Sequence, residues 1–371
     1  MVILQNNNKN RVYSLYKRLI FMGPLTGEVN GQNLVTQKIL EQFEDLGVDL
    51  RVVDTSSSPK FLSYFAKLCC HFKACAVVLS FPGDIYLSLN SNKGLWLSLI
   101  VATVGKFRGK KVGVHHHSFA HVRQKSLAMS LLVKVISGKG FHIVLGGAMS
   151  RGLKKLYPDA TNIFVLNNAI VVPCEYTQIS QADNSVLRIG HLSNLSIEKG
   201  CAEVVKASIA AKLAGYNVRL NLAGPVGDSK TMDQINKARH VLKGDLEVWG
   251  PVYGQDKKSF FEAIDIFHFP SAYKNEAEPL VVLESLASGV AVAATDIGCI
   301  AEDIGNGAGV IVRNDVKGLE DFVDFLALYQ KDKALYKARS RARFFELLED
   351  SHQQFLSVNN FYFFPEKNIS H

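Results

Sequence analysis

The chain has 371 residues, of which 47% are hydrophobic, 20% charged and 10% aromatic, and its formal net charge is +8. Apolar content this high excludes an intrinsically disordered chain, because burial of apolar side chains can offset the loss of chain entropy. Composition also excludes collagen and a coiled coil. The length predicts two domains or one large one.

Membrane-spanning and disulfide-rich classes are also disfavoured. The longest apolar stretch, Leu95 to Gly105, is well short of the roughly 20 residues that a helix needs to cross a bilayer. The first ten residues lack a charged start, a long apolar segment and a small-residue cleavage site, so we expect no export signal. Six cysteines without a CxxC pair indicate neither a disulfide framework nor a zinc site. We therefore expect a cytoplasmic protein with reduced thiols.

Charge is unevenly distributed along the chain. Residues 1–180 contain 21 Lys and Arg against 9 Asp and Glu, whereas residues 181–371 contain 21 against 25. Basic residues beside an apolar helical surface suit an anionic membrane face, although a solvated helix flank is the simpler alternative. No nucleic-acid-binding motif accompanies the charge, so we expect no nucleic-acid partner. The basic residues that follow the apolar stretch are Lys106, Arg108, Lys110, Lys111, Arg123, Lys125 and Lys134.

Short runs rich in Val, Ile and Leu alternate with helical patterns through most of the chain. This alternation predicts buried parallel strands joined by crossover helices, and hence an α/β fold. The first series of predicted strands comprises residues 18–22, 48–54, 76–80, 111–117, 142–145 and 163–166. The second series comprises residues 186–189, 218–223, 246–249, 264–269, 290–294 and 309–312.

A polar connector at residues 167–185 separates the two series and predicts two Rossmann-like domains. We place the boundary at Gln181, which gives domains of residues 1–181 and 182–350. Residues 351–371 contain aromatic side chains that need a surface to bury against, so we expect this segment to pack on the first domain. Two open α/β domains that face each other form a cleft at the carboxyl ends of their strands, where such folds bind ligands.

The loops after the first strand of each domain are candidate ligand sites. No G-x-G-x-x-G fingerprint occurs, which disfavours a nicotinamide-dependent enzyme. Gly23, Gly27 and Gly31 instead precede a helix expected near Asn33, where glycines admit a substrate and a helix N-terminus favours an anion. An ordinary strand-to-helix turn is the alternative. In the second domain, Lys199 either neutralises a diphosphate or is a solvated surface residue.

A triple histidine ends one predicted strand. Alternation sends His115 and His117 to one face and His116 to the other. A metal site is one interpretation of the cluster, but no carboxylate or cysteine lies nearby in the sequence to complete a ligand shell.

Residues 267–300 contain a Glu-x7-Glu pair, with Glu276 in a predicted loop and Glu284 in a helix expected at residues 279–288. In this context the segment resembles the nucleotide-sugar signature of glycosyltransferase family 4, the retaining transferases of the GT-B architecture. The resemblance covers most of the second domain and is looser in the first. It is carried by Pro270-Ser271, Asn275-Glu276-Ala277, Pro279-Leu280, Leu283-Glu284 and Ala294-Thr295-Asp296-Ile297-Gly298, with Gly190, Lys199-Gly200, Gly224, Gly250 and Asp265 at the expected places.

The resemblance implies roles for individual residues. Glu276 would lie against the donor sugar hydroxyls, Glu284 would hold the nucleotide ribose, and Lys199 would bind the donor diphosphate. His117 would lie near the donor sugar, so the implied catalytic residues are Glu276, His117 and Lys199. The other implied donor-binding residues are Gly27, His191, Gly224, Ala277, Pro279 and Leu280. The implied acceptor-side residues are Gly23, Thr26, Gly27, His116 and Ser118.

One position departs from the family pattern. Members usually place an arginine just after the glycine that opens the second domain, closely followed by a lysine; here that position is His191, and Lys199 comes eight residues later. Three alternatives follow: His191 contributes to the diphosphate site, another cation such as Arg188 substitutes, or the longer loop remodels the contact. Because the chain has no Asp-x-Asp, we expect neither a metal nor another cofactor.

The resemblance implies a retaining hexosyltransferase that moves a sugar from a nucleoside-diphosphate sugar to an acceptor hydroxyl. The basic first half favours a membrane-bound acceptor, such as a lipid-linked glycan or a lipopolysaccharide or other surface-polysaccharide intermediate, on the inner face of the cytoplasmic membrane. Two other functions stay open: a non-catalytic GT-B-like subunit that docks a polysaccharide-assembly complex, and a nucleotide-sugar epimerase.

Overall fold

The computed structural model describes residues 17–26, 31–56, 63–89, 94–174 and 185–364. The chain divides into two compact units, Met1–Asn167 with Ser351–His371, and Asn168–Asp350. This division comes earlier in the chain than the predicted boundary at Gln181, a residue outside the described ranges. Within those ranges, no helix combines the length and the apolar character that crossing a membrane requires.

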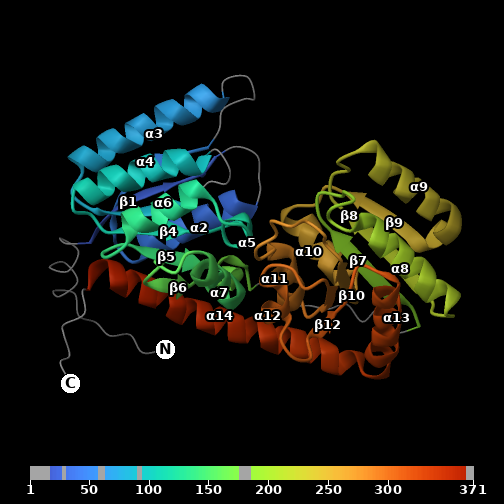
Figure 1. The fold of residues 1–371 in the computed structure, drawn as a ribbon. Coiled ribbons are helices and arrows are strands. Elements are labelled where there is room, and N and C mark those ends of the chain that lie inside the picture. Colours follow the sequence, from blue (N-terminus) through green and yellow to red (C-terminus); the bar gives the residue numbers. More distant parts are fainter. Residues whose placement is uncertain (1–16, 27–30, 57–62, 90–93, 175–184, 365–371) are drawn as a thin grey trace. The chain divides into compact units, whose positions relative to one another are not determined.

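The first unit is built on a six-stranded parallel sheet of order β2-β1-β3-β4-β5-β6 (Figure 1). Buried apolar side chains on nearly every strand fit a sheet that is covered on both faces. The strands are β1 (Arg18–Gly23), β2 (Asp49–Asp54), β3 (Asp84–Ser88), β4 (Val112–His115), β5 (Phe141–Val144) and β6 (Ile163–Val165). The helices are α2 (Gly31–Asp45), α3 (Ser63–Ser80), α4 (Gly94–Phe107), α5 (Ala120–Arg123), α6 (Leu127–Ile136) and α7 (Gly147–Leu156).

The third predicted strand, residues 76–80, is wrong. These residues form the last turns of α3, and the strand that follows is Asp84–Ser88. His71, Ala74 and Val78 are buried at helical spacing, so the period of this segment is that of a helix. A short run of Val and Leu does not by itself distinguish a strand from the end of a buried helix. The other eleven predicted strands are confirmed to within a few residues at their ends.

The second unit contains a parallel sheet of order β12-β11-β10-β7-β8-β9. From β7 the chain adds β8 and β9 on one side, and it then returns to place β10 on the other side of β7. Open α/β sheets bind ligands beyond the carboxyl ends of their strands at such a reversal. The strands are β7 (Leu187–Leu192), β8 (Val218–Ala223), β9 (Leu246–Gly250), β10 (Ile266–Phe269), β11 (Ala291–Ala294) and β12 (Gly309–Ile311). The helices are α8 (Cys201–Leu213), α9 (Ser229–Leu242), α10 (Gly254–Glu262), α11 (Leu280–Ala287), α12 (Ile300–Ile304), α13 (Val316–Lys331) and α14 (Lys333–Phe363), with 3-10 turns at Asn168–Val171 and Lys243–Asp245.

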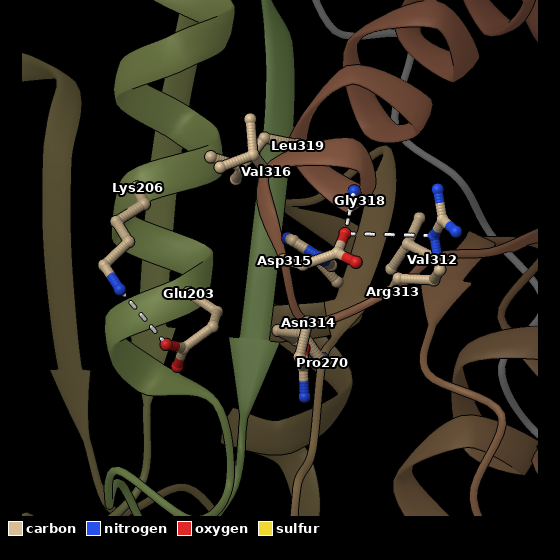
Figure 2. A pocket seen from close by; sticks show the side chains of 11 residues that line it. Glu203, Lys206, Pro270, Val312, Arg313, Asn314, Asp315, Val316, Gly318 and Leu319 are labelled. Carbon is tan, nitrogen blue, oxygen red and sulfur yellow. Dashed lines mark hydrogen bonds and ion pairs between the residues drawn. The ribbon is translucent and has the colours of Figure 1, made fainter.

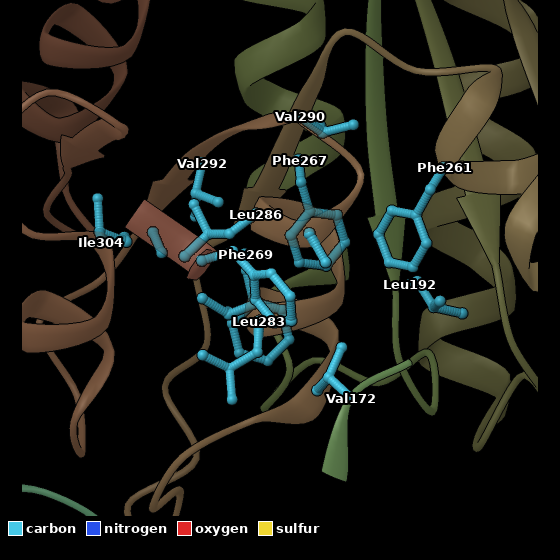
Figure 3. Packing of buried hydrophobic residues seen from close by; sticks show 14 of the residues in the cluster. Val172, Leu192, Phe261, Phe267, Phe269, Leu283, Leu286, Val290, Val292 and Ile304 are labelled. Carbon is cyan, nitrogen blue, oxygen red and sulfur yellow. The ribbon is translucent and has the colours of Figure 1, made fainter. Parts of the chain in front are cut away.

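Apolar side chains pack on both faces of this second sheet. Phe267 and Phe269 point from β10 to one face, where they pack with Leu283 and Leu286 of α11 (Figure 3). Ile266, the neighbour in the strand, belongs to the cluster under α8, α9 and α13 on the other face. Because burial of a Leu or Phe side chain contributes about 1.5–3 kcal/mol, this packing holds α11 firmly against the sheet.

The end of α14 belongs to the first unit, as expected from its aromatic side chains. Phe355 packs on Phe43 with ring centroids 5.0 Å apart. The Tyr362 hydroxyl donates a hydrogen bond to the carbonyl of Ile85 at 2.9 Å. The expected return of the chain to the first sheet is therefore confirmed.

Candidate active site

Two lysine–glutamate pairs of the second unit, Lys199–Glu276 and Lys257–Glu284, each join separate elements of the fold. Lys199, in the loop after β7, places Nζ 2.5 Å from Oε2 of Glu276, which lies in the loop after β10. Lys257 of α10 places Nζ 2.5 Å from Oε1 of Glu284 on α11. The first pair thus joins the two strands between which the strand order reverses. Residues 77 positions apart in the sequence, both implied as donor ligands, are brought together.

The Lys199–Glu276 pair is partly buried, with side chains 24% and 11% exposed. The ammonium also lies 4.7 Å from the centre of the Tyr273 ring, in cation–π geometry. A pair in this setting is weakly screened by solvent, because its surroundings are less polarisable than water. The lysine is therefore held in place by the Glu276 carboxylate and the Tyr273 ring, and it is not a freely solvated surface residue.

Glu284 has an oxygen without a partner. Its side chain is 5% exposed, and while Oε1 pairs with Lys257, Oε2 is buried and accepts no hydrogen bond from the described residues. A buried acceptor left unsatisfied costs about 1–3 kcal/mol. A carboxylate can accept hydrogen bonds from hydroxyl groups at both oxygens, so a ribose or sugar ligand would satisfy this one.

The sequence alone does not identify Lys257 as a candidate site residue. It lies on α10, outside the glutamate motif, and no motif or spacing marks it before the fold is known. Only the packing of α10 beside α11 reveals that it pairs with Glu284.

The loop that carries Glu276 is fixed by backbone contacts. The N–H of Cys299 donates to the carbonyl of Ala277 at 2.7 Å, and the Thr295 hydroxyl donates to the carbonyl of Ser271 at 2.6 Å. Ala277 and Pro279 are buried, and Pro279 precedes the first turn of α11, which begins at Leu280. These implied donor residues shape the loop that holds Glu276.

Two glycines allow the loops at the carboxyl edge to approach each other closely. Gly224 has φ of +120°, and a Cβ there would lie 1.7 Å from the carbonyl oxygen of Ser193. Gly200 has φ of +86°, and a Cβ there would lie 2.3 Å from the carbonyl oxygen of Pro270. Both positions therefore require glycine for conformation and for space. The observed role of Gly224 is to let the loops after β7 and β8 meet.

His191 occupies the position of the missing arginine, but it is fully buried. Nδ1 lies 2.9 Å from the carbonyl oxygen of His268, and Nε2 lies 2.9 Å from the Ser193 hydroxyl. Burial lowers the pKa of His191 to about 4, so the ring is neutral near pH 7. Arg188 pairs with Asp265 at 3.4 Å near the amino end of β7, which excludes it as a substitute at the carboxyl edge. Of the three alternatives, a remodelled contact made by the longer loop that carries Lys199 stays a prediction.

The glycine loop of the first unit is only partly described. Gly27 lies outside the described residues. Gly23 ends β1, where a Cβ would come within 2.6 Å of Cγ2 of Thr36, so tight packing requires its small size. The Thr26 hydroxyl donates to Asp54 Oδ2 at 2.6 Å, which closes the loop onto the end of β2.

The three histidines at the end of β4 and just after it separate to two faces, as alternation predicts. The rings of His115 and His117 are 4.1 Å apart, whereas His116 contacts His142 at 3.0 Å. Burial lowers the pKa values of His117 and His142 to about 3. The Ser118 hydroxyl accepts from the N–H of Ala120 at the start of α5. No group of three or more potential metal ligands gathers among the described side chains.

A separate cavity of about 250 Å³ lies between α8 and α13 (Figure 2). Its charged lining groups pair with each other: Lys206 with Glu203 at 3.3 Å, and Arg313 with Asp315 at 3.8 Å. Asp315 also accepts from the N–H of Gly318 and thereby caps α13. Lys199, Glu276, Lys257 and Glu284 do not line this cavity.

Glu278 lies in the same loop as Glu276 and helps to hold that loop in place. Its position in the sequence indicates only that it is a loop residue. It is 6% exposed, and Oε2 accepts from the N–H of Asn168 at 2.6 Å. Burial, together with the nearby charge of Asp303, raises its pKa well above the usual value and favours the neutral acid.

We expect Glu278→Ala to destabilise the second unit by about 1–3 kcal/mol, because it leaves the Asn168 N–H without its acceptor. Glu278→Gln keeps an acceptor oxygen and should retain most of the stability. Urea unfolding of both variants provides the measurement. Equal losses for Ala and Gln would contradict this role.

Comparisons with known proteins identify a family match in the second unit and a fold shared with solved structures. Residues 184–327 match the family model described as Glycosyl transferases group 1. The whole chain is similar to HepE of Anabaena solved with UDP (TM-score 0.68, 15% identity, 92% of this chain and 100% of that one). It is also similar to sucrose-phosphate synthase of Thermosynechococcus elongatus (TM-score 0.69, 14% identity, 93% and 98%) and to a glycosyltransferase of Rickettsia africae (TM-score 0.68, 14% identity, 95% and 100%). No curated protein matches the sequence significantly.

The comparisons confirm the expected GT-B fold, with two separate α/β units that each contain a six-stranded parallel sheet. The family match covers most of the second unit, including both lysine–glutamate pairs. It assigns this unit to the glycosyltransferases, and the chain is an enzyme of that class.

Proposed function

We propose that the protein transfers a hexose from a nucleoside-diphosphate sugar to an acceptor hydroxyl with retention of anomeric configuration. The observation that carries the proposal is a pair of glutamates, Glu284 buried and Glu276 partly buried, each beside a lysine, in a unit that matches glycosyltransferases. HepE, which shares the fold, has been solved with UDP-glucose, so this is the first donor to test.

Each residue of the two pairs has a distinct role in donor binding. Glu284 accepts hydrogen bonds from ribose hydroxyls at its unpartnered oxygen, and Lys257 holds the other oxygen in an ion pair. Glu276 accepts hydrogen bonds from hydroxyl groups of the donor sugar. Lys199 binds the diphosphate and stabilises the charge that develops on it as the bond to the sugar breaks. The proposal includes no metal, because a held lysine supplies the positive charge that a cation would otherwise provide.

The transfer step in this proposal takes place on one face of the sugar. The bond between the anomeric carbon and the diphosphate oxygen breaks, and the acceptor oxygen bonds to the same face of that carbon. The acceptor proton passes to the leaving phosphate oxygen, so no protein nucleophile is needed. His117, whose ring is neutral near pH 7, contributes a hydrogen bond near the donor sugar and no positive charge.

The acceptor in this proposal is held at the membrane, as a lipid-linked glycan or a lipopolysaccharide or other surface-polysaccharide intermediate. The strong excess of basic residues in the first half of the chain supports this choice. Acceptor-side contacts come from the first unit, near Thr26, His116 and Ser118.

Donor turnover tests the proposal directly. The protein is incubated with UDP-glucose and with GDP-, ADP- and dTDP-sugars, with and without EDTA, while nucleoside diphosphate release and proton NMR of the sugar are followed. We expect release from one donor despite EDTA, and an α-linked donor should first give the α sugar. Initial formation of the β sugar would contradict retention, and interconversion of sugar isomers without release would indicate an epimerase. No turnover and no binding of any donor would favour the docking subunit.

We expect Lys257→Met to raise the KM for the donor about tenfold or more, because hydrogen bonds to charged groups contribute about 1.5–3 kcal/mol and Glu284 would lose its counter-charge. The kcat should change less, since Lys257 pairs with the ribose-binding residue and not with Glu276. Lys258→Met is the matched control, because the neighbouring lysine on α10 has no ion pair among the described residues. Equal KM changes in both variants would contradict the role of Lys257.

A further inference from the structure

Helices α3, α4 and α6 of the first unit carry apolar side chains on their outer surfaces. α4 packs against both of the other helices, so the three form one layer over the sheet (Figure 1). The outer side of such a layer normally faces water and is polar. Here seven large hydrophobic side chains on these helices are 38–87% exposed: Phe72, Leu79, Trp96, Ile100, Phe107, Leu127 and Leu131.

The exposed residues follow helical spacing and form a stripe on each helix. Trp96, Ile100 and Phe107 are four and seven residues apart on α4, and Leu127 and Leu131 are four apart on α6. α4 also buries a second apolar stripe against the sheet, so it is apolar on both sides. In the described part of the first unit, four other large hydrophobics are comparably exposed, and none of them lies on these helices.

The charged residues in this part of the chain are nearly all basic. Residues 55–158 contain 15 Lys and Arg but a single acidic residue, Asp84. Asp84 begins β3, where its carboxylate accepts from the N–H of Lys111 at 2.8 Å, so it lies in the sheet and not on the outer helices. A cavity of about 240 Å³ at the ends of α4 and α6 is lined by Lys106, Lys110 and Lys139 and by no acidic side chain.

We propose that the outer surface of α3, α4 and α6 docks on an anionic lipid bilayer. The apolar stripes would enter the boundary between head groups and acyl chains, and the lysines at the ends of α4 and α6 would meet lipid phosphates. Interfacial binding needs both a buried apolar area and attraction to anionic lipid, and this surface supplies both. The inference deepens the proposed function by naming the surface that brings the enzyme to its acceptor, but docking itself requires no donor chemistry.

Trp96 reports directly on this docking. The chain has two tryptophans, and Trp249→Phe leaves Trp96 as the single tryptophan, which can be excited selectively over tyrosine. Vesicles of phosphatidylglycerol and phosphatidylcholine should shift its emission to the blue, and lipids brominated on the acyl chain should quench it. Vesicles of phosphatidylcholine alone should have little effect. Unchanged emission with anionic vesicles would overturn the proposal. A shift that depends on protein concentration without lipid would also overturn it and identify a contact between two copies of the chain.

Test and control variants show whether vesicle binding depends on this surface in particular or only on the overall charge and hydrophobicity of the protein. We expect Lys106→Glu with Lys139→Glu, and separately Ile100→Ser with Phe107→Ser, to reduce vesicle partitioning at least ~10-fold. The matched controls are Lys230→Glu with Lys237→Glu on α9, and Leu213→Ser on α8, which are exposed on the second unit. Equal losses in test and control variants would overturn the proposal.

Release of nucleoside diphosphate from a soluble donor should stay at the wild-type level in all of these variants. Failure of docking and failure of the proposed glycosyl transfer are therefore distinguishable.

Discussion

Glu276→Ala should lower kcat/KM for donor turnover by at least ~10²-fold, because removal of one preorganised group that stabilises a transition state typically costs that much. The variant loses the acceptor for the sugar hydroxyls, and it also frees Lys199 from a contact of 2.5 Å that positions its ammonium. Nucleoside diphosphate release, followed at saturating and at low donor concentration, measures the effect.

The pair should behave as one unit. Because Lys199 and Glu276 are in direct contact, Lys199→Ala in the Glu276→Ala background should cost much less than the product of the two single effects. Glu198→Ala is the control, since its exposed side chain lies beside Lys199 in the same loop and its structural contact is made by the backbone carbonyl. Near-normal turnover by Glu276→Ala would contradict the assignment of this site.

A fall in pH from 7.5 to 5.5 should destabilise the protein by several kcal/mol. Burial lowers the pKa to about 3 for His117, His142 and His268 and to about 4 for His191. In the unfolded chain these rings take up protons below about pH 6.5, whereas in the folded protein they stay neutral, so acid favours unfolding. Stability is then complete above pH 6.5 and falls as the pH drops, by about 1.4 kcal/mol per pH unit for each such histidine.

Urea unfolding between pH 8 and pH 5 measures this dependence. The slope of the unfolding free energy against pH counts the protons that the chain takes up on unfolding. His142→Asn should reduce this number by about one, even if the variant is less stable at every pH. The matched control is His240→Asn, because His240 lies exposed on α9 and is not one of the four buried histidines. A free energy of unfolding that does not vary between pH 8 and pH 5.5 would contradict the prediction that these four buried histidines stay neutral in the folded protein.

Most of the sheet framework could be predicted from local pattern, because buried parallel strands are continuous apolar runs. The failure at residues 76–80 has a physical cause: Val77, Val78 and Leu79 end a helix whose outer face is also apolar, so polarity does not reveal its period. The same apolar outer face is the basis of the proposed membrane contact. The misassigned strand and the proposed docking surface therefore share one origin.

The candidate site was predictable where a motif specifies it and not elsewhere. The resemblance to glycosyltransferase family 4 points to Glu276, Glu284 and Lys199, whereas their positions after strands and in a helix do not identify them without it. Lys257 was missed because it reaches Glu284 only through the packing of α10 beside α11. The neutral state of His191 likewise depends on the fold, because burial of the ring lowers its pKa to about 4 and the sequence alone does not reveal that burial.

Binding of nucleotides to the second unit tests the central claim most directly. Calorimetric titration of UDP, GDP, ADP and dTDP into the whole protein, in the presence of EDTA, would be compared between wild type and Glu284→Gln. The account predicts that one of these nucleotides binds the wild type and that Glu284→Gln weakens its affinity about tenfold or more, because the buried carboxylate receives the ribose hydroxyls. No binding by the wild type, or equal binding by the variant, would contradict it.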